Sequence, residues 1–261
     1  MKNFNFKSAT NIKEATKLAS GRATFLAGGM TLLPAMKLRL AAYSDLINIK
    51  KIKGLSGIKV SSKSLRIGST VTHAEVANSK EVGKSISSLA VLAEGIGDPQ
   101  VRNRGTIGGS IANNDPAADY PSACLALNAT IHTSKRKIQA DKFFTGMFET
   151  DLKKGELIEA IEFEVPEKSA YAKFPNPASR YAIVGAYVAK LKKEVRVAIT
   201  GAGNYVFRSK ELEAALSSNF SPSTIDKISI STKGLNSDIH ASAEYRAHLI
   251  KVMTRKAVSS C

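Results

Sequence analysis

A glycine-rich segment near the middle of the chain, Val101–Asp119, constrains the fold more than any other feature. It reads VRNRGTIGGSIANNDPAAD and packs three glycines, two arginines and two acids into a stretch without a regular amphipathic period. Glycines permit positive φ and close backbone approach, so several N–H donors can converge on one anion, with the hydroxyls of Thr106 and Ser110 beside them. The plain alternative is a tight turn between two strands. We interpret the segment as a binding site for a phosphate or pyrophosphate.

A second glycine cluster earlier in the chain supports this interpretation. In Phe25–Pro34, FLAGGMTLLP, an apolar run typical of a strand meets Gly28 and Gly29 and continues into a run typical of a helix. A strand–turn–helix arrangement directs the free N–H groups of the helix start, with their partial positive charge, at whatever lies above the turn. Two ordered clusters are more specific than either alone, and they weaken the plain-turn alternative.

The composition limits the class of protein. With 261 residues, 43% of them hydrophobic, the chain can bury a sizeable core as one large domain or two small ones. No run of about 18 apolar residues is present for a membrane span, and Met1–Phe6 lacks the apolar core of a signal peptide. We therefore expect a cytoplasmic chain that does not span a membrane.

Cysteine content and charge bear on metals and partners. The only cysteines, Cys124 and Cys261, are far apart, so neither a disulfide framework nor an iron–sulfur or zinc site is expected, and any metal centre must belong to a partner chain. The net charge of +16 raises nucleic acid as a candidate. The basic residues lie in short scattered clusters without interleaved aromatic residues, which favours a solvated basic surface, part of it facing acidic partner subunits, over nucleic-acid binding.

The first part of the chain is expected to form a small parallel α/β unit followed by a mixed sheet. The expected elements are a helix from Ile12 to Ala19, a strand at Ala23–Ala27, a short helix through Leu40, a strand at Asp45–Ile49, a hairpin around Ile58–Ile67, a helix from the capping box at Thr72, a helix at Ser85–Glu94 and a strand near Ile107–Ala112.

The second part changes character near residue 168, where Pro166, Pro175 and Pro177 bracket the chain. Before it we expect a helix at Pro121–Leu127 and strands at Ala129–Thr133 and Ile161–Val165; after it we expect antiparallel strands at Tyr181–Lys190 and Glu194–Thr200 and helices at Leu212–Leu216 and Ala243–Val258. The fold class is α+β, with domains at residues 1–167, in subdomains of about 1–55 and 56–167, and at residues 168–261.

Other candidate motifs point to structure rather than chemistry. Gly201–Val206 superficially matches a dinucleotide fingerprint, but Val206 replaces the third glycine and no βαβ unit follows. Asp115 and Asp119 suit hydrogen bonding better than metal binding, because only His132 lies near them and no further ligand is in sight. His73 is interpreted as a packed or surface residue, and no Ser/His/Asp or Cys/His nucleophile arrangement is recognisable.

The two glycine clusters resemble those of a known family. AGGMTLLP, followed by RNRGTIGGSIANNDPAAD, is similar to the motifs of the FAD-binding medium subunits of molybdenum hydroxylases, and most similar to the aerobic carbon monoxide dehydrogenase type. The likeness extends from about Phe4 to the last helix. It implies a noncovalently bound FAD in a two-subdomain fold of the vanillyl-alcohol-oxidase type, followed by a C-terminal α+β domain.

The resemblance also implies a set of cofactor-binding residues. Two loops would hold the pyrophosphate, the first formed by Ala27, Gly28, Gly29, Met30 and Thr31 and the second by Thr106, Ile107, Gly108, Gly109 and Ser110. Asp119 matches an acid that binds the sugar-alcohol chain of FAD, Ile158 an apolar residue beside the adenine or ring system, and Lys173 a basic residue of the next strand. Two positions depart from the pattern and bear on the flavin potential: Met30 replaces a frequent Asp or His, and Arg180 replaces a frequent Asp.

The function that the resemblance implies is that of an oxidoreductase subunit in electron transfer. Electrons would leave a molybdopterin large subunit through the [2Fe–2S] clusters of a small subunit, reach FAD on this chain and pass to oxygen, NAD or a quinone, in a complex resembling a dimer of heterotrimers. One alternative is a free-standing FAD-dependent oxidase or reductase, which would need an acid beside its substrate and a longer substrate domain. The other is a basic binding module without flavin.

Overall fold

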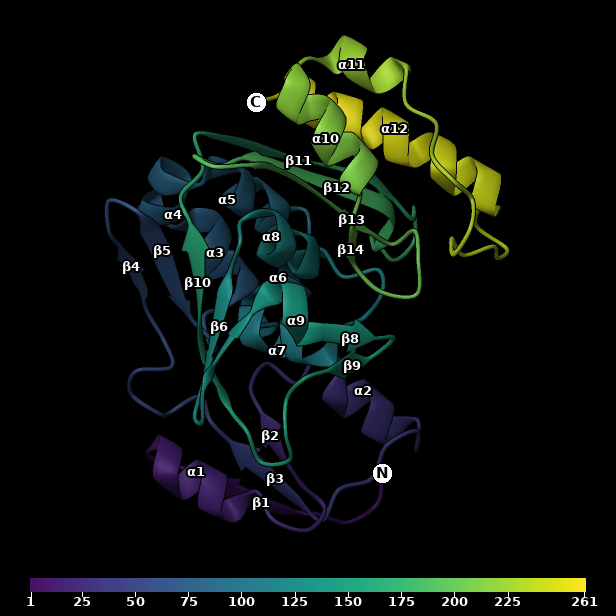
Figure 1. Cartoon of the computed structure of the whole chain (residues 1–261). Helices are drawn as coiled ribbons and strands as arrows, with labels where there is room; N and C mark the ends of the chain where they lie inside the picture. Colours follow the sequence, from purple (N-terminus) through teal and green to yellow (C-terminus); the bar gives the residue numbers. More distant parts are fainter.

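The computed structural model describes all residues from 1 to 261, and its sheets divide the chain into three successive parts. A small N-terminal unit lies at one end, a larger middle part follows, and a C-terminal sheet with its covering helices lies at the other end (Figure 1). No helix in this structure combines the length and the apolar character that crossing a bilayer demands.

The N-terminal unit is the expected parallel α/β arrangement. It contains β1 (Asn5–Ser8), α1 (Ile12–Leu18), β2 (Ala23–Leu26), α2 (Leu32–Lys37) and β3 (Asp45–Asn48), with the strands in the order β1-β3-β2, all parallel. The side chain of Asn11 accepts a hydrogen bond from the backbone of Glu14 and so begins α1. Because β2 ends at Leu26, the first glycine cluster follows directly at the carboxyl end of a parallel strand.

The middle part contains a five-stranded sheet in the order β4-β5-β10-β6-β7. Its strands are β4 (Ile58–Val60), β5 (Ser64–Gly68), β6 (Thr130–Thr133), β7 (Lys137–Gln139) and β10 (Ile158–Glu164), and a separate hairpin joins β8 (Phe144–Gly146) to β9 (Glu149–Thr150). All four pairings in the large sheet are antiparallel, so the expectation of a mixed sheet is wrong. The reason is topological: two pairings are hairpins, and β10 enters between β5 and β6 in the direction opposite to both.

Short helices connect β5 to β6. They are α3 (His73–Asn78), α4 (Lys80–Ser85), α5 (Ser87–Glu94), α6 (Pro99–Arg104), α7 (Ile107–Asn113) and α8 (Tyr120–Ala126), with α9 (Ala140–Phe143) after β7. The capping box at Thr72 forms as expected. The expected strand near Ile107–Ala112 is wrong, because this segment is helix α7.

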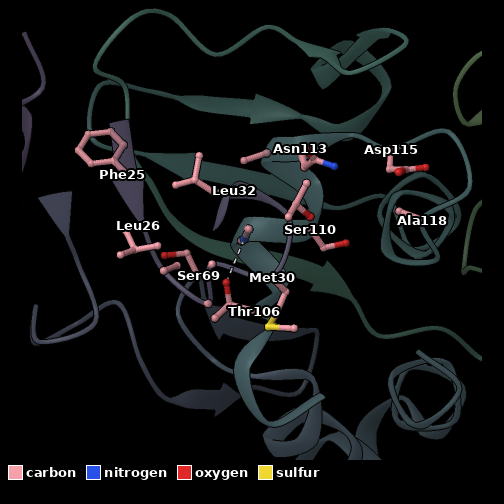
Figure 2. A pocket seen from close by; sticks show the side chains of 18 of the residues that line it. Phe25, Leu26, Met30, Leu32, Ser69, Thr106, Ser110, Asn113, Asp115 and Ala118 are labelled. Carbon is pink, nitrogen blue, oxygen red and sulfur yellow. Dashed lines mark hydrogen bonds between the residues drawn. The ribbon is translucent and has the colours of Figure 1, made fainter. Parts of the chain in front are cut away.

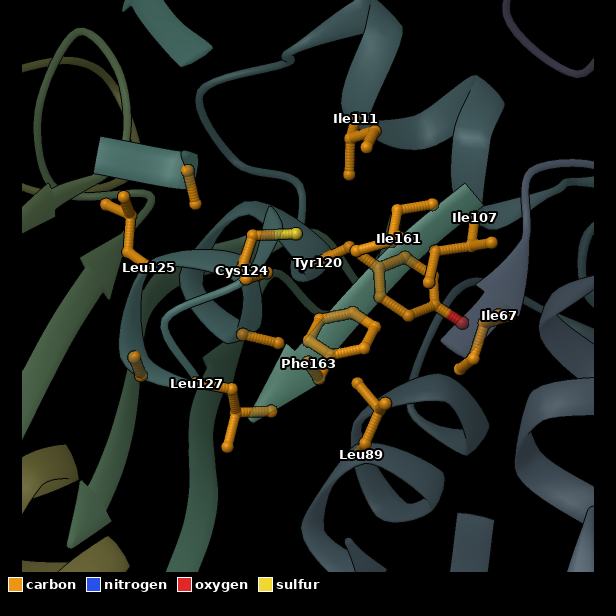
Figure 3. Packing of buried hydrophobic residues seen from close by; sticks show 14 of the residues in the cluster. Ile67, Leu89, Ile107, Ile111, Tyr120, Cys124, Leu125, Leu127, Ile161 and Phe163 are labelled. Carbon is orange, nitrogen blue, oxygen red and sulfur yellow. The ribbon is translucent and has the colours of Figure 1, made fainter. Parts of the chain in front are cut away.

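Local signals explain why α7 is a helix. The side chain of Thr106 caps its start, and Asn114 ends it in the left-handed conformation with φ 44°. Ile107 and Ile111 are four positions apart and therefore lie on one helical face, which packs towards Tyr120 and Ile161 in the main core (Figure 3). Buried apolar residues four positions apart follow the helical period. This pattern outweighs the preference of β-branched isoleucines for strands.

The C-terminal part is an antiparallel sheet covered by helices. The sheet order is β11-β12-β13-β14, formed by β11 (Lys168–Pro175), β12 (Ala182–Lys190), β13 (Val195–Thr200) and β14 (Phe207–Arg208), and the helices are α10 (Lys210–Ser218), α11 (Pro222–Asp226) and α12 (Ala243–Ser259). Helices α10 and α12 lie on one face, while α5 and α8 of the middle part pack on the other. Every residue of β13 is therefore buried, on both faces of the sheet.

Polar contacts also join the middle and C-terminal parts. The Ser88 hydroxyl on α5 lies 2.6 Å from the hydroxyls of both Ser169 and Tyr187. The guanidinium of Arg196 on β13 donates to the Leu125 carbonyl at 3.0 Å and to the carboxylate of Asp141. These contacts hold the C-terminal sheet in one position relative to the cavity described next.

Candidate functional site

A cavity of about 670 Å³ lies where the three parts meet. It is lined by both glycine clusters, by Ser69, His73, Asp115, Asp119 and Ile158 of the middle part, and by Ser179–Tyr181 of the C-terminal part. Figure 2 shows Phe25, Leu26 and Leu32 along one side, Asp115 and Ala118 along the other, and Thr106, Ser110 and Met30 between them. The volume lies within the range of cavities that bind cofactors.

The first loop, residues 27–31, presents free backbone donors. The N–H groups of Gly28, Gly29, Met30, Thr31 and Leu32 donate to no group of the protein, whereas the next N–H, that of Leu33, bonds the Gly29 carbonyl at 3.0 Å. Gly29 has φ +77°, and Thr31 begins α2 without a side-chain cap. Unpaired N–H groups at a helix start are donors suited to phosphate oxygens.

Close packing explains the glycine at position 28. A Cβ on Gly28 would lie 2.1 Å from the carbonyl oxygen of Arg104 and 2.9 Å from the Cα of Gly105. The two loops therefore touch through backbone atoms, and any side chain at Gly28 would separate them.

The second loop, residues 105–110, uses its backbone donors within the protein. Ile107 donates to the Val71 carbonyl at 3.0 Å, Gly108 to the Ser69 carbonyl at 2.9 Å and Ser110 to the Thr106 carbonyl at 2.9 Å. The Gly109 N–H donates to Thr106 Oγ1 at 3.1 Å, the bond drawn in Figure 2. What this loop offers the cavity is the surface of two glycines and the hydroxyl groups of Thr106 and Ser110.

Asp119 lies at the start of α8 and is held by side chains from β11 of the C-terminal part. It accepts a hydrogen bond from the Tyr171 hydroxyl, and Lys173 Nζ lies 3.0 Å from its Oδ1 and 3.2 Å from its Oδ2. Burial raises the pKa of Asp119, while the positive charge of Lys173 opposes that rise. Since a carboxylate offers about four acceptor positions, Asp119 retains capacity for a ligand hydroxyl.

The remaining predicted residues divide into two groups. Ala27, Met30, Thr31 and Ile158 line the cavity, and Met30 is 38% exposed. Ile107 is fully buried in the core, and neither it nor Lys173 is part of the cavity lining; Lys173 reaches the site only through Asp119.

Ser69 and His73 are among the polar residues of the cavity wall that lie outside the predicted site. Ser69 and His73 are buried, at 3% and 5% exposure, and Ser69 Oγ and His73 Nδ1 have no hydrogen-bond partner. Burial, with Arg102 adding to it, lowers the pKa of His73 to about 4, so its imidazole is neutral at pH 7. Both residues flank the second loop: Gly108 packs against Ser69, and the His73 N–H donates to the Gly105 carbonyl. The capping box locates His73 at a helix start, but no sequence signal directs it at the loop.

The Gly201–Val206 motif is away from this site. Gly201 has φ +80°, its added Cβ would lie 2.3 Å from the Ala182 carbonyl oxygen, and no residue from 201 to 206 lines the cavity. The Gly201 carbonyl accepts a hydrogen bond from the Arg246 guanidinium at 2.9 Å. These glycines serve a tight connection between strands.

The cavity fits a ligand with phosphate groups. Its first loop has free N–H donors, close packing excludes side chains at Gly28 of the first loop and Gly108 of the second, and its wall contains unpaired polar atoms. Fold and site together define an α+β protein that binds a phosphate-bearing cofactor between two glycine loops.

Comparison with known families specifies which class this is. The family model described as the FAD binding domain in molybdopterin dehydrogenase matches residues 2–167, and that described as the CO dehydrogenase flavoprotein C-terminal domain matches residues 169–261. The chain belongs to this family of FAD-binding medium subunits of molybdenum hydroxylases. The resemblance drawn from the glycine clusters, the α+β fold and the FAD cofactor are thereby confirmed.

Individual relatives agree over nearly the whole chain. The chain is similar to the glyceraldehyde dehydrogenase medium chain of Sulfolobus acidocaldarius, at 34% identity over 97% of this chain and 96% of the relative. It is 33% identical to the nicotine 6-hydroxylase medium subunit of Paenarthrobacter nicotinovorans, over 97% and 95%. Among solved structures, a cyanide-inactivated Cu,Mo-CO dehydrogenase matches with a TM-score of 0.91 at 28% identity, over 98% and 96%. The chain is thus an oxidoreductase component.

Proposed function

We propose that this chain receives electrons from the [2Fe–2S] clusters of a partner subunit and passes them through its FAD to an external acceptor. The observation that carries the proposal is the cavity between the two loops, with the unpaired N–H groups of residues 28–32 on one side. When bound there, the flavin supplies the redox chemistry. The residues of the chain bind the cofactor, orient it and limit its contact with water.

Each predicted site residue has a proposed role. The N–H groups of Gly28, Gly29, Met30 and Thr31 bind the pyrophosphate, with Ala27 leading into that loop, and the hydroxyls of Thr106 and Ser110 bind from the facing side. Gly108 and Gly109 keep the space open, and Ile107 anchors their helix in the core. Asp119 accepts from the sugar-alcohol chain, Lys173 holds Asp119 in place, and Ile158 contacts a ring system.

The proposed partners are a [2Fe–2S] small subunit and a molybdopterin large subunit, assembled as a dimer of heterotrimers in the cytoplasm. We further propose that residues 1–167 form the FAD-binding domain and residues 168–261 a C-terminal domain. The support is that relatives are named medium chains or subunits, one of them as subunit alpha of a dehydrogenase complex, and that the chain matches over 90% of their length.

Cofactor binding is tested by fluorescence titration of the apoprotein with FAD and with FMN. FAD should bind and FMN much more weakly, because FMN lacks the second phosphate and the adenine that the first loop and the cavity would accommodate. The variant Gly109→Val should lose FAD, because the valine side chain fills space beside Thr106. The control Gly203→Ala should retain FAD, because the added Cβ would lie 3.4 Å from its nearest neighbouring atoms. Equal affinity for the two flavins would contradict the two-loop site.

Electron entry is tested by stopped-flow absorbance at the flavin band. With an organic substrate of the hydroxylase, the flavin should be reduced only when both partner subunits are added to the FAD-loaded chain. Rapid reduction of the isolated chain would instead identify a free-standing flavoenzyme.

A further inference from the structure

Three cationic side chains converge on the turn that follows α5. Lys173 Nζ donates to the Gly95 carbonyl at 2.9 Å, and Arg102 Nη1 donates to the Ile96 carbonyl at 3.1 Å and the Gly97 carbonyl at 3.2 Å. Arg180 Nη1, from the turn between β11 and β12, donates to the same Gly97 carbonyl at 3.2 Å. Carbonyls at a helix end attract cations, which accounts for one such contact but not for two guanidinium groups on one oxygen.

The charges of these groups are not balanced. Lys173 is paired with Asp119, but neither Arg102 nor Arg180 makes a salt bridge with a carboxylate. Asp115 and Asp119 of the cavity wall form no salt bridge with either arginine: Asp119 binds Lys173, and Asp115 accepts from the Ala117 N–H at 2.9 Å. Two like charges sharing one carbonyl oxygen repel each other, and an anion between them would remove that repulsion.

Arg180 lines the cavity and is also exposed to solvent. Ile96 and Gly97 belong to the same lining, whereas Arg102 lines a neighbouring pocket that also contains Glu94. The turn that contains Arg180 is ordered by Asn176, whose carbonyl accepts from the Arg180 N–H at 2.9 Å. A guanidinium has five N–H donors, and Arg180 uses one of them within the protein.

We propose that Arg180, an exposed residue of the cavity wall, forms an anion-binding subsite with Arg102 beside it on the same Gly97 carbonyl, and that this subsite takes the negatively charged group of a small electron acceptor. The inference rests on the proposed function, since it concerns the acceptor that takes electrons from the bound flavin. The planar fork of a guanidinium suits phosphate, carboxylate and sulfonate groups, which accept two parallel hydrogen bonds. The subsite is distinct from the first loop, whose donors belong to backbone amides.

Binding is tested by calorimetric titration of the FAD-loaded chain with inorganic pyrophosphate. The variant Arg180→Asn suits the backbone, because Arg180 has φ 61° and asparagine tolerates this left-handed conformation. The affinity of this variant for pyrophosphate should be about tenfold lower than that of the wild type. The affinity of Arg180→Lys should lie between those of the wild type and Arg180→Asn. The matched control is Arg39→Asn, because Arg39 is also exposed, has φ 62° and lies outside the cavity lining.

The outcomes separate the inference from the proposed function. FAD affinity is measured first, and a wild-type chain that binds no FAD would overturn both. Unchanged FAD affinity with weaker pyrophosphate binding in Arg180→Asn supports the subsite. An equal loss in Arg39→Asn would show a diffuse charge effect, and a loss of FAD affinity in Arg180→Asn would assign Arg180 to the cofactor; either result overturns the subsite.

The link to the acceptor needs a kinetic measurement. The flavin is reduced by dithionite and then mixed with ferricyanide, an anion, or with hexaammineruthenium(III), a cation. Each ion removes one electron, so two ions reoxidise one two-electron-reduced flavin. Arg180→Asn should slow the reoxidation of the flavin by ferricyanide more than Arg39→Asn does. It should not slow the reoxidation by hexaammineruthenium(III). Equal effects of the two variants on ferricyanide would overturn the acceptor role.

Discussion

The two glycine loops of the cavity look alike in sequence but differ in what their backbones do. The first precedes a short helix, the second continues into the first turn of one, and each contacts the other. The N–H groups of residues 28–32 are unpaired, whereas those of Ile107, Gly108, Gly109 and Ser110 are all used inside the protein. The first loop is therefore a binding element and the second a supporting wall with two hydroxyl groups. A glycine cluster by itself does not distinguish these roles, because glycine serves ligand approach and close backbone packing equally well.

The strongest test of this difference is Gly108→Ala, which should destabilise the fold. Its Cβ would lie 2.5 Å from Ser69 Cβ and 2.6 Å from the Ser69 carbonyl oxygen, and this neighbour is backbone that cannot turn away. We expect a loss of about 3 kcal/mol in the free energy of unfolding, measured by urea denaturation without FAD. Gly83→Ala has open space around it within α4 and should be neutral or slightly stabilising. An unaffected Gly108→Ala would remove the supporting role of the second loop.

Gly28→Ala should act mainly on the cofactor. Its Cβ would meet the Arg104 carbonyl oxygen at 2.1 Å, so the first loop must move away from the second, and the N–H groups no longer converge. We expect FAD affinity to fall about 100-fold, or about 2.7 kcal/mol, with a smaller change in unfolding than for Gly108→Ala. If the two variants show the reverse order, the roles of the loops are exchanged.

His73, behind the second loop, should make stability depend on pH. Burial, and further the charge of Arg102, lower the pKa of His73 from 6.5 to about 4. Between these two pH values the unfolded chain binds a proton at His73 that the folded chain does not bind. The contribution of His73 is fully present above pH 6.5 and is lost as the pH falls towards 4, by about 2 kcal/mol at pH 5. In urea titrations at pH 7 and pH 5, His73→Gln should show a correspondingly smaller loss than the wild type. Identical losses would mean that His73 is protonated in the folded protein.

Ser110→Ala should have the smallest effect. The Ser110 hydroxyl lines the cavity and makes no hydrogen bond within the protein. Its removal should leave the free energy of unfolding unchanged and lower the FAD affinity about fivefold, or about 1 kcal/mol. Fluorescence titration measures this, with Ser134→Ala as a contrasting variant, because Ser134 Oγ accepts from the Leu157 N–H at 3.1 Å and serves structure. A stability loss in Ser110→Ala without any change in FAD affinity would place this hydroxyl among the structural ones.

Sequence reasoning reached some parts of the site and missed others for identifiable reasons. The strand–turn–helix at Phe25–Pro34 is local, so its apolar runs and paired glycines specify it directly. The expected strand near Ile107–Ala112 is helix α7, and Thr106 and Asn114 could have indicated where this helix begins and ends. Ser69 and His73 were missed because their position in the site depends on packing against a segment more than thirty residues further along the chain.

The sequence by itself determined the two glycine clusters, their order, the parallel N-terminal unit and the family to which the chain belongs, since these depend on short-range patterns of glycine, hydroxyl and apolar residues. Only the tertiary structure decided which loop keeps its N–H groups free, because that depends on whether the carbonyls of Ser69, Val71 and Thr106 reach the second loop. It also decided that Asp119 is held by Tyr171 and Lys173 from β11, and that Arg180 and Arg102 share one carbonyl. Most of these hydrogen bonds join groups far apart in the sequence that only folding brings together, so no single stretch of the chain identifies both partners.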